Sequence, residues 1–279
     1  MIPVAVFVHL STESEEPGVG FSLQDKVVFV TGASAGIGEA TAREFAPLGA
    51  RLLLCARRVG KLKEMEPELR RLGAKDMFSF ELDVRDREQV ESTLASLPNE
   101  WRKVEVLVNN AGLSRGLSKL YQDQVQDWEE MIDTNVKGLL YVTRAVVPGM
   151  VERGSGHVIS LGSTAGHLAY PKGGVYCATK AAERFISDGL RLDLNGTRVR
   201  VSSVDPGMVK TDFSRVRFRG NEERAAKTYE NVEPLTPEDI AETIVWVATR
   251  PPHMMIQSVV LTPTAQANAF VLTRGELGS

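Results

Sequence analysis

The chain has 279 residues, of which 43% are hydrophobic and 25% charged, as in ordinary globular proteins. Its 33 basic and 36 acidic side chains give a formal charge of −3, so no overall positive field attracts nucleic acid or anionic lipid. The first apolar run, residues 2–10, is too short to span a bilayer and follows no basic residue. Cys55 and Cys177 are too few for a disulfide framework and are expected to be free thiols. We therefore expect a cytoplasmic protein with neither nucleic-acid nor membrane partners.

The first 24 residues differ from the rest of the chain. Residues 11–20 are polar, acidic and glycine-bearing, which is typical of loosely attached segments. We expect residues 1–24 to form a flexible N-terminal extension and residues 25–279 to form one domain. The extension could instead add an edge strand or cover a neighbouring subunit, and the sequence does not decide between these alternatives.

From residue 26 onward, short β-branched runs alternate with longer amphipathic stretches. The near-continuous apolar runs predict strands that are covered on both faces, at residues 26–31, 50–56, 77–82, 104–110, 156–163, 199–204 and 256–262. Helical patterns occupy residues 37–48, 61–72, 87–97, 128–153 and 176–194. Another helix is expected to begin at Pro237, with Thr236 as its N-cap. This alternation predicts an α/β fold: a single-domain, doubly wound, seven-stranded parallel sheet of Rossmann type with helices on both faces.

The first strand leads through a glycine-rich turn, residues 31–38 (TGASAGIG), directly into a helix. Glycines let a backbone approach a pyrophosphate closely, and a helix N-terminus offers free N–H groups and positive potential. A tight turn without a ligand is the alternative for this motif taken alone. We expect a dinucleotide to contact the turn at Gly32, Ser34, Gly36, Ile37 and Gly38.

The second strand ends in Arg57 and Arg58, where an NAD site would place an acidic residue against the adenosine ribose. Two guanidinium groups and no carboxylate suit a 2′-phosphate. The pair therefore favours NADP over NAD as the cofactor. The alternative is a solvated arginine pair at the start of a helix, and Ala35 stands in the glycine turn where NADP enzymes often carry another basic residue.

Tyr176 and Lys180 lie four residues apart and so share one face of a predicted helix. An ammonium group close to a phenol favours the phenolate and lowers the tyrosine pKa toward neutrality. Ser163 ends a strand thirteen residues before Tyr176, at the edge where a doubly wound sheet binds its ligand. The three residues together predict a catalytic group, whereas the pair alone could be a surface tyrosine and lysine.

With these motifs in this order, the chain resembles the single-domain short-chain dehydrogenase/reductases. The further matches are Asp83-Val84, Asn109-Asn110-Ala111-Gly112, Asn135 and Pro206-Gly207. The resemblance covers nearly all of residues 26–262, and the N-terminal extension departs from the compact members. Residues 109–113, 128–153 and 216–238 look most like the NADP-dependent 3-hydroxy acid dehydrogenases. Those enzymes act on serine, allo-threonine, 3-hydroxyisobutyrate or malonic semialdehyde.

The resemblance implies roles for the candidate catalytic residues. Tyr176 would exchange a proton with the substrate oxygen, and Ser163 would donate a hydrogen bond to that oxygen. Lys180 would lower the Tyr176 pKa and bind the nicotinamide ribose, while Asn135 would hold a water that links Lys180 to solvent.

The resemblance also implies contacts to the cofactor. Asp83 would meet the adenine edge and Asn110 a ribose. Further cofactor contacts are expected at Val84, Pro206, Gly207, Val209 and Thr211.

Residues 208–231 are rich in charged and aromatic side chains and are expected to form a lid over the substrate. A hydroxy acid needs a cation for its carboxylate, and Arg217 is the candidate, although a solvated lid arginine is an equal alternative. His167 could line the pocket, but a lone histidine is more often a satisfied polar residue. No cluster has metal-ligand spacing, so no metal is expected.

Two other functions remain open. One is reduction of another carbonyl class, such as a 3-ketoacyl thioester, a steroid or a sugar. The other is NADP sensing without turnover, which the intact catalytic set argues against.

The expected assembly is a homotetramer, as is usual in the family, with a dimer as alternative. Ile186, Leu190 and Leu194 place apolar side chains on more than one helix face, as subunit pairing across a two-fold axis would require.

Overall fold

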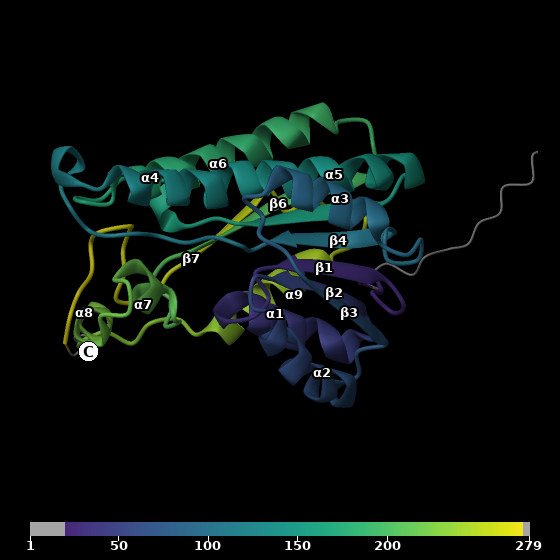
Figure 1. Ribbon diagram of the computed structural model, residues 1–279, viewed down its shortest axis with the longest axis horizontal. Coiled ribbons are helices and arrows are strands. Elements are labelled where there is room, and N and C mark those ends of the chain that lie inside the picture. Colours follow the sequence, from purple (N-terminus) through teal and green to yellow (C-terminus); the bar gives the residue numbers. More distant parts are fainter. Residues whose placement is uncertain (1–19, 276–279) are drawn as a thin grey trace, which may run out of the picture.

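The computed structural model describes residues 20–275 as a parallel sheet between two layers of helices (Figure 1). The strands are β1 (Val27–Thr31), β2 (Arg51–Ala56), β3 (Asp76–Glu81), β4 (Val104–Asn109), β5 (Gly156–Leu161), β6 (Val199–Pro206) and β7 (Ser258–Leu261). Their order in the sheet is β3-β2-β1-β4-β5-β6-β7, and each neighbouring pair is parallel. The predicted doubly wound, seven-stranded sheet is confirmed.

Helices connect successive strands. The α-helices are α1 (Gly36–Phe45), α2 (Val59–Leu72), α3 (Arg87–Ser96), α4 (Val125–Ile132), α5 (Leu139–Arg153), α6 (Gly174–Asp193), α7 (Phe213–Arg217), α8 (Glu222–Thr228) and α9 (Pro237–Ala248). Shorter turns are η1 (Ala46–Leu48), η2 (Leu120–Gln122), η3 (Asp133–Gly138) and η4 (Thr164–Gly166). Thr236 and Asp239 form a reciprocal capping box at the start of α9, as the Thr-Pro sequence predicts. Within residues 20–275, no helix is both long and apolar enough to cross a bilayer.

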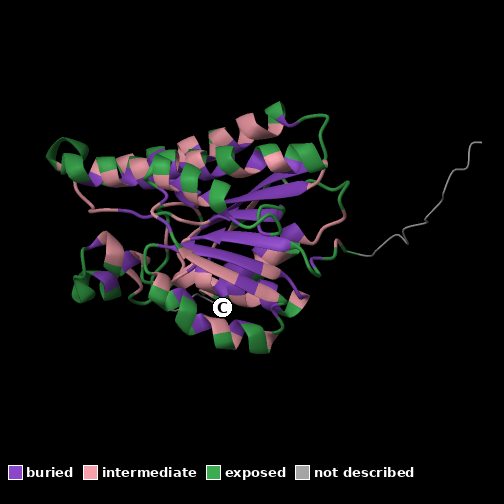
Figure 2. Cartoon of the chain, turned by 45° about the vertical axis from the view of Figure 1, so that its right-hand side comes forward, coloured by how far each residue is buried: buried purple, intermediate pink, exposed green. Residues whose placement is uncertain are grey.

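The sheet has a hydrophobic core on each face, because successive side chains of a strand point in opposite directions. Val28 of β1 packs in the core that contains Phe45 of α1 and Ile240 of α9. Its neighbour Phe29 belongs to the opposite core with Met150 of α5. The central strands are accordingly buried along their length (Figure 2).

The segment predicted as one helix, residues 128–153, is interrupted by the π turn η3 between α4 and α5. Within η3, Gly138 lies so close to Val84 that a Cβ there would be 2.7 Å from the valine Cγ2. The wider turn also directs Asn135 at the loop after β4. Such π turns depend on packing and not on apolar periodicity, so the sequence pattern misses this one.

The N-terminal extension is described only from residue 20, and residues 1–19 of the expected flexible segment lie outside the described part. Phe21 N donates to the Thr249 carbonyl at 2.8 Å. Leu23 is 2% exposed and belongs to the same core as α1 and α9. Residues 20–24 are therefore packed and not loosely attached, because these two apolar side chains cover the end of that core.

Two side chains expected at a subunit contact are internal. Leu194 is buried in the core on the α5 side of the sheet, and Leu190 packs against that core. The exposed apolar side chains of α6 are Phe185 and Leu192 instead. The helical period alone does not show which of several apolar faces meets the sheet.

The arrangement of strands positions the site. All seven carboxyl ends lie at one edge of the sheet, and the chain reverses its winding direction between β1 and β4. Loops that leave a sheet at such a point diverge and form a crevice. The short helices α7 and α8 lie beyond this edge, below α4 in the view of Figure 1.

Candidate active site

A cavity of about 500 Å³ occupies the predicted crevice. It is lined by the turn after β1, the ends of β2 to β6, the first turns of α6 and residues 206–216. The expected site residues in its lining are Gly32, Ser34, Gly36, Ile37, Arg57, Arg58, Asp83, Val84, Asn110, Tyr176, Lys180, Pro206, Gly207, Val209 and Thr211. Four expected site residues are absent from that lining: Gly38, Asn135, Ser163 and Arg217.

The turn after β1 requires glycine at several positions. Gly32 and Gly36 have φ angles of 65° and 54°, in the left-handed region that disfavours other residues. A Cβ at Gly38 would be 2.4 Å from Asn110 Nδ2 and 2.6 Å from the Gly32 carbonyl oxygen. Gly38 thus supports the turn from behind, and the N-terminus of α1 is left open to the crevice.

Asn110 braces this turn from the end of β4. Its Nδ2 donates to the carbonyls of Thr31 at 2.8 Å and Gly32 at 3.2 Å. Thr31 Oγ1 accepts from the backbone N–H groups of Asn110 and Ala111, each at 3.0 Å. With its amide N–H groups used in this way, Asn110 has its side-chain oxygen left for another partner.

Arg57 and Arg58 stand exposed at the mouth of the crevice. Arg58 Nη2 is 3.4 Å from Ser34 Oγ, so the guanidinium reaches toward the glycine turn. Among the described residues, neither arginine forms an ion pair, unlike Arg215 on the same cavity, which pairs with Asp212 at 3.0 Å. The two free cations and the hydroxyl of Ser34 suit a phosphate group.

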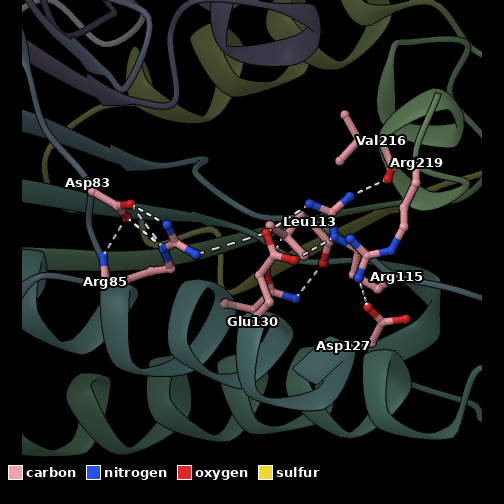
Figure 3. A network of polar contacts seen from close by, with 9 residues as sticks. Asp83, Arg85, Leu113, Arg115, Asp127, Glu130, Val216 and Arg219 are labelled. Carbon is pink, nitrogen blue, oxygen red and sulfur yellow. Dashed lines mark hydrogen bonds and ion pairs between the residues drawn. The ribbon is translucent and has the colours of Figure 1, made fainter. Parts of the chain in front are cut away.

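Asp83 follows β3 and carries its own counter-charge (Figure 3). Arg85 Nε donates to both carboxylate oxygens at 2.9 and 3.0 Å, and Nη2 donates to one of them at 2.5 Å. Burial opposes ionisation of Asp83, but Arg85 outweighs it and lowers the pKa of the carboxyl. Asp83 is therefore a fixed anion on the cavity wall.

Tyr176 lies in the first turn of α6 and is 8% exposed. Its ring packs against Phe213 of α7, with ring centroids 5.6 Å apart. The guanidinium carbon of Arg217 is 5.3 Å from the centre of the Tyr176 ring. The phenol thus faces the cavity from an apolar wall that holds a cation.

Lys180 lies one turn further along α6 and lines the same cavity. Its Nζ donates to the Leu161 carbonyl at 2.6 Å and to Glu183 Oε2 at 2.8 Å. Burial alone would lower the Lys180 pKa, but Glu183, Tyr176 and Asp205 together outweigh it and raise the pKa, Glu183 by both its charge and its hydrogen bond. The ammonium is therefore kept charged, and its third N–H has no acceptor among residues 20–275, so it can donate to a ligand.

Ser163 and Asn135 are held by neighbours within the fold. Ser163 Oγ accepts from Ala165 N at 3.1 Å and makes a long contact of 3.4 Å to the Pro206 carbonyl. Asn135 is 1% exposed and exchanges hydrogen bonds of 2.9 and 2.8 Å with the Leu113 backbone. Its Nδ2 also donates to Thr179 Oγ1 at 3.0 Å, so both side-chain N–H groups are occupied.

Arg217 lies beside the cavity wall, in a cluster of aromatic rings. Its Nε donates to Ser114 Oγ at 3.0 Å and its Nη2 to Tyr170 OH at 2.8 Å. Nη1 has no hydrogen-bond partner in the part of the chain that the structure describes. Burial raises the Tyr170 pKa, so Tyr170 stays a neutral phenol that accepts from the guanidinium.

The segment of residues 208–231 is tied to α4 by a network that the sequence did not reveal (Figure 3). Arg115 donates to both oxygens of Glu130, at 2.7 and 2.8 Å, and to the Val216 carbonyl. Arg219 pairs with Asp127 of the same helix. These partners are far apart along the chain, so only the fold brings them together.

A second group missed from the sequence lies behind Lys180. Besides Glu183, it contains Asp205, which directly precedes Pro206 and is 1% exposed. Asp205 accepts from Ser258 Oγ at 2.9 Å and pairs with His167 Nε2 at 2.7 Å. The spacing of three between Lys180 and Glu183 was the visible signal, because such residues are neighbours on a helix.

The described residues of this region form no cluster of metal ligands. Within residues 20–275, no group of three or more His, Cys, Asp or Glu side chains is arranged to hold a metal ion.

Comparisons with known proteins agree on one family. Residues 26–222 match the model of the short chain dehydrogenases. An NADP-dependent 3-hydroxy acid dehydrogenase of Salmonella typhi is 51% identical over 244 residues, which are 87% of this chain and 97% of the relative. The closed form of a serine dehydrogenase complexed with NADP+ has a TM-score of 0.84 and 48% identity, over 90% of this chain and all of that one. Serine dehydrogenase from Escherichia coli has a TM-score of 0.75 and 44% identity, over 86% of this chain and 99% of that chain.

The network around Arg115 predicts how the segment of residues 208–231 is restrained. Arg115→Met keeps an unbranched side chain but removes the bonds to Glu130 and Val216, so backbone amides of residues 213–228 should exchange hydrogen several-fold faster. Hydrogen exchange read by mass spectrometry measures this. Arg102→Met, at an exposed arginine that contacts Asn99, is the matched control. Equal exchange in all three proteins would mean that Arg115 does not restrain the segment.

Proposed function

The chain belongs to the short-chain dehydrogenase family and is an NADP-dependent oxidoreductase acting on CH–OH groups, and from this premise we propose its substrate and the roles of its residues. The substrate is a small 3-hydroxy acid of the serine, allo-threonine, 3-hydroxyisobutyrate or malonic semialdehyde type. The observation that carries the proposal is that one cavity holds Tyr176, Lys180 and, beyond a glycine turn, two arginines that form no ion pair with any described residue. The relatives named above support the choice of substrate.

The cavity fits NADP in its local chemistry. Gly32 and Gly36, which have positive φ angles, line the cavity without a side chain, so a pyrophosphate can approach the backbone of the turn there. Arg57, Arg58 and Ser34 bind the 2′-phosphate at the mouth. Asn110 and Lys180 bind the riboses, and Asp83 meets the adenine edge. NADP(H), when bound, supplies or accepts the hydride at the reacting carbon.

Proton transfer belongs to Tyr176. In the reductive direction the phenol gives its proton to the substrate oxygen, and in the oxidative direction the phenolate takes the hydroxyl proton. The Lys180 ammonium favours the phenolate by its charge. The apolar wall formed by Phe213 limits the access of water and strengthens that effect.

Ser163 and Asn135 support this step in different ways. The long contact between Ser163 Oγ and the Pro206 carbonyl is weak, so the hydroxyl can turn to donate to the reacting oxygen. The Asn135 amide, with both N–H groups committed, fixes the loop at Leu113 and the hydroxyl of Thr179. A link from Lys180 to solvent through Asn135 would therefore use its backbone carbonyl and not its side chain.

The substrate carboxylate binds Arg217. The guanidinium is held beside the Tyr176 ring by Ser114 and Tyr170, and its Nη1 remains available. A hydroxy acid with its carboxylate on Nη1 would place its hydroxyl near the phenol. Residues 208–231 act as the lid that carries this cation.

The assembly we propose is a homotetramer in the cytoplasm. Phe185 and Leu192 of α6 are 66% and 78% exposed, and Leu140 and Val151 of α5 are also exposed; both helices belong to the upper helical layer of Figure 1. Exposed apolar side chains on α5 and α6 suit a symmetric contact between subunits. Cys55 and Cys177 are both buried free thiols, which suits a reducing compartment.

The role of Tyr176 predicts the effect of removing its hydroxyl. Tyr176→Phe should lower kcat by at least about 10²-fold, the lower range for loss of a general acid or base, and leave NADPH affinity within about twofold. Steady-state kinetics and fluorescence titration measure the two effects. Tyr121→Phe, at an exposed tyrosine, is the control. Retention of more than a few per cent of kcat would exclude the assigned role.

The cofactor preference depends on the free arginine pair. Arg57→Ala combined with Arg58→Ala should weaken NADP+ by about 2–3 kcal/mol, roughly 30- to 150-fold in Kd, and leave NAD+ almost unchanged. Calorimetry with both nucleotides gives the comparison. The control is Arg70→Ala with Arg71→Ala, in the last turn of α2. An equal loss for both nucleotides would show that Arg57 and Arg58 serve folding.

The substrate assignment predicts a selective effect at Arg217. Arg217→Met keeps the bulk of the stem and removes the charge, so KM for serine or 3-hydroxyisobutyrate should rise about 10- to 100-fold. KM for a neutral alcohol of similar size should change little. Arg224→Met, at a lid arginine stacked on Phe218 at 4.4 Å, is the control.

Two outcomes would contradict this assignment. If the acid and the neutral alcohol lose equally, Arg217 only shapes the lid. If the unmodified enzyme prefers the neutral alcohol, the substrate is another carbonyl class.

A further inference from the structure

A buried carboxyl group lies behind the proposed proton donor. Glu183 is 2% exposed, and its Oε2 accepts from Lys180 Nζ at 2.8 Å. Its other oxygen, Oε1, is buried without a hydrogen-bond partner among the described residues. Buried ion pairs gain little stability over apolar side chains of similar size, so a gain in stability is a weak reason for an acid at this place.

A second acid increases the negative charge at this place. Asp205 of β6 lies close enough to raise the pKa values of both Lys180 and Glu183. On its outer side Asp205 pairs with His167, whose Nδ1 is 3.4 Å from Arg184 Nη1. The Lys180 ammonium is thus compensated from the side away from the cavity.

The other groups that face Tyr176 do not provide this compensation. Arg217 from α7 is a second cation near the ring, and Tyr170 is a neutral phenol. Cys177 next to Tyr176 has a raised pKa, because burial disfavours its thiolate. Glu183 is therefore the acid in direct contact with a cation of the proposed catalytic pair.

The remaining elements packed on α6 direct their charges elsewhere. Two acids of α4 pair across the network of Figure 3, Asp127 with Arg219 and Glu130 with Arg115, and the third, Glu129, is exposed. In η3, Asp133 pairs with Lys137 at 2.8 Å.

We propose that Glu183 is a positioning residue for the reaction: it holds the Lys180 ammonium against the Leu161 carbonyl, offsets its charge, and so sets the pH range in which Tyr176 exchanges its proton. The inference rests on the proposed role of Tyr176. It assigns the balance of charge at the site to a residue that touches neither substrate nor cofactor.

The sign of the effect comes from the charges. Burial raises the pKa of Glu183 to about 7, because the ionised form is poorly solvated, and the neighbouring ammonium opposes this only in part. Above that pH the pair is neutral and favours the Tyr176 phenolate less than a lone ammonium would. Tyr176 and Glu183 are seven residues apart on one helix, roughly 10 Å. At that distance and an effective dielectric constant of about 20, one charge shifts a pKa by about one unit.

The first test compares pH profiles of serine oxidation with NADP+. Glu183→Gln keeps the shape and the hydrogen bond to Lys180 but removes the charge. The acidic limb of kcat/KM, which reports formation of the phenolate, should move down by about one pH unit. Above pH 7, where Glu183 is ionised, and below the limb, this is a gain of up to about tenfold in kcat/KM. An unmoved limb in a folded, active Glu183→Gln enzyme would overturn the inference.

The matched control is Asp188→Asn on the same helix. Asp188 also pairs with a cation three residues away, Arg191 Nη1 at 2.7 Å, but this pair lies far from Tyr176 along α6 and is half-exposed on the acid's side. Its profile should coincide with that of the unmodified enzyme. A shift of equal size in both variants would show a general charge effect and overturn the inference.

A second measurement needs no turnover. The ultraviolet absorbance of phenolate is titrated with pH in the unmodified enzyme and in Glu183→Gln, each with and without Tyr176→Phe, and the difference isolates Tyr176 among the five tyrosines. Its midpoint should fall by about one unit in Glu183→Gln. If it falls and no hydroxy acid is oxidised, the proposed function fails and this inference stands. An unchanged midpoint overturns it, whatever the activity.

The Glu183→Asp variant keeps the test decisive if Glu183→Gln does not fold. Aspartate retains the charge, but its side chain is one methylene shorter, so the carboxylate lies further from Lys180 Nζ. We expect a shift of less than half a unit in the same direction, together with weaker NADP+ binding as the ammonium loses its support. A profile and an NADP+ affinity both equal to those of the unmodified enzyme would overturn the inference.

Discussion

The parallel direction of all seven strands is the constraint from which the site follows. Every strand ends at the same edge of the sheet, so residues from distant parts of the sequence meet there. Thr31 ends β1, Leu161 ends β5 and Pro206 ends β6, and the backbone of each contributes to the site. The carbonyl ends of the strands hold Asn110, Lys180 and the hydroxyl of Ser163. The sheet is thus the scaffold and also supplies hydrogen-bond acceptors.

The cations around the cavity fall into two groups with different tasks. Arg57 and Arg58 lie exposed and unpaired among the described residues, so they can accept an anion without first leaving a partner. Lys180 and Arg115 are already paired with carboxylates, which fixes their positions before any ligand arrives. In the proposed function the free cations recognise the ligand, whereas the paired cations hold the site in shape. Arg217 combines the two, since neutral hydroxyls hold it and leave its charge uncompensated.

Much of the fold was predictable because its signals are local. The glycine turn and the pair of Tyr176 and Lys180 each occupy a few consecutive residues, and short, near-continuous apolar runs identify the strands. Features that depend on tertiary contacts were not predictable. The π turn depends on Gly138 meeting Val84, and the tether from Arg115 to Val216 joins residues 101 positions apart. Short-range patterns specify the backbone, whereas packing decides which apolar face is internal and which charge has a partner.

The π turn makes this part of the molecule sensitive to chain length. Each residue added to or removed from a helix rotates the rest of that helix by about 100° about the axis. Loss of one residue from η3 could restore a regular helix, but α5 would keep its contacts with the sheet only if α4 turned by that angle. Asn135 would then leave Leu113, and Asp127 and Glu130 would face away from Arg219 and Arg115. A substitution in η3 would change one side chain, whereas a single deletion would rotate the whole of α4 relative to α5.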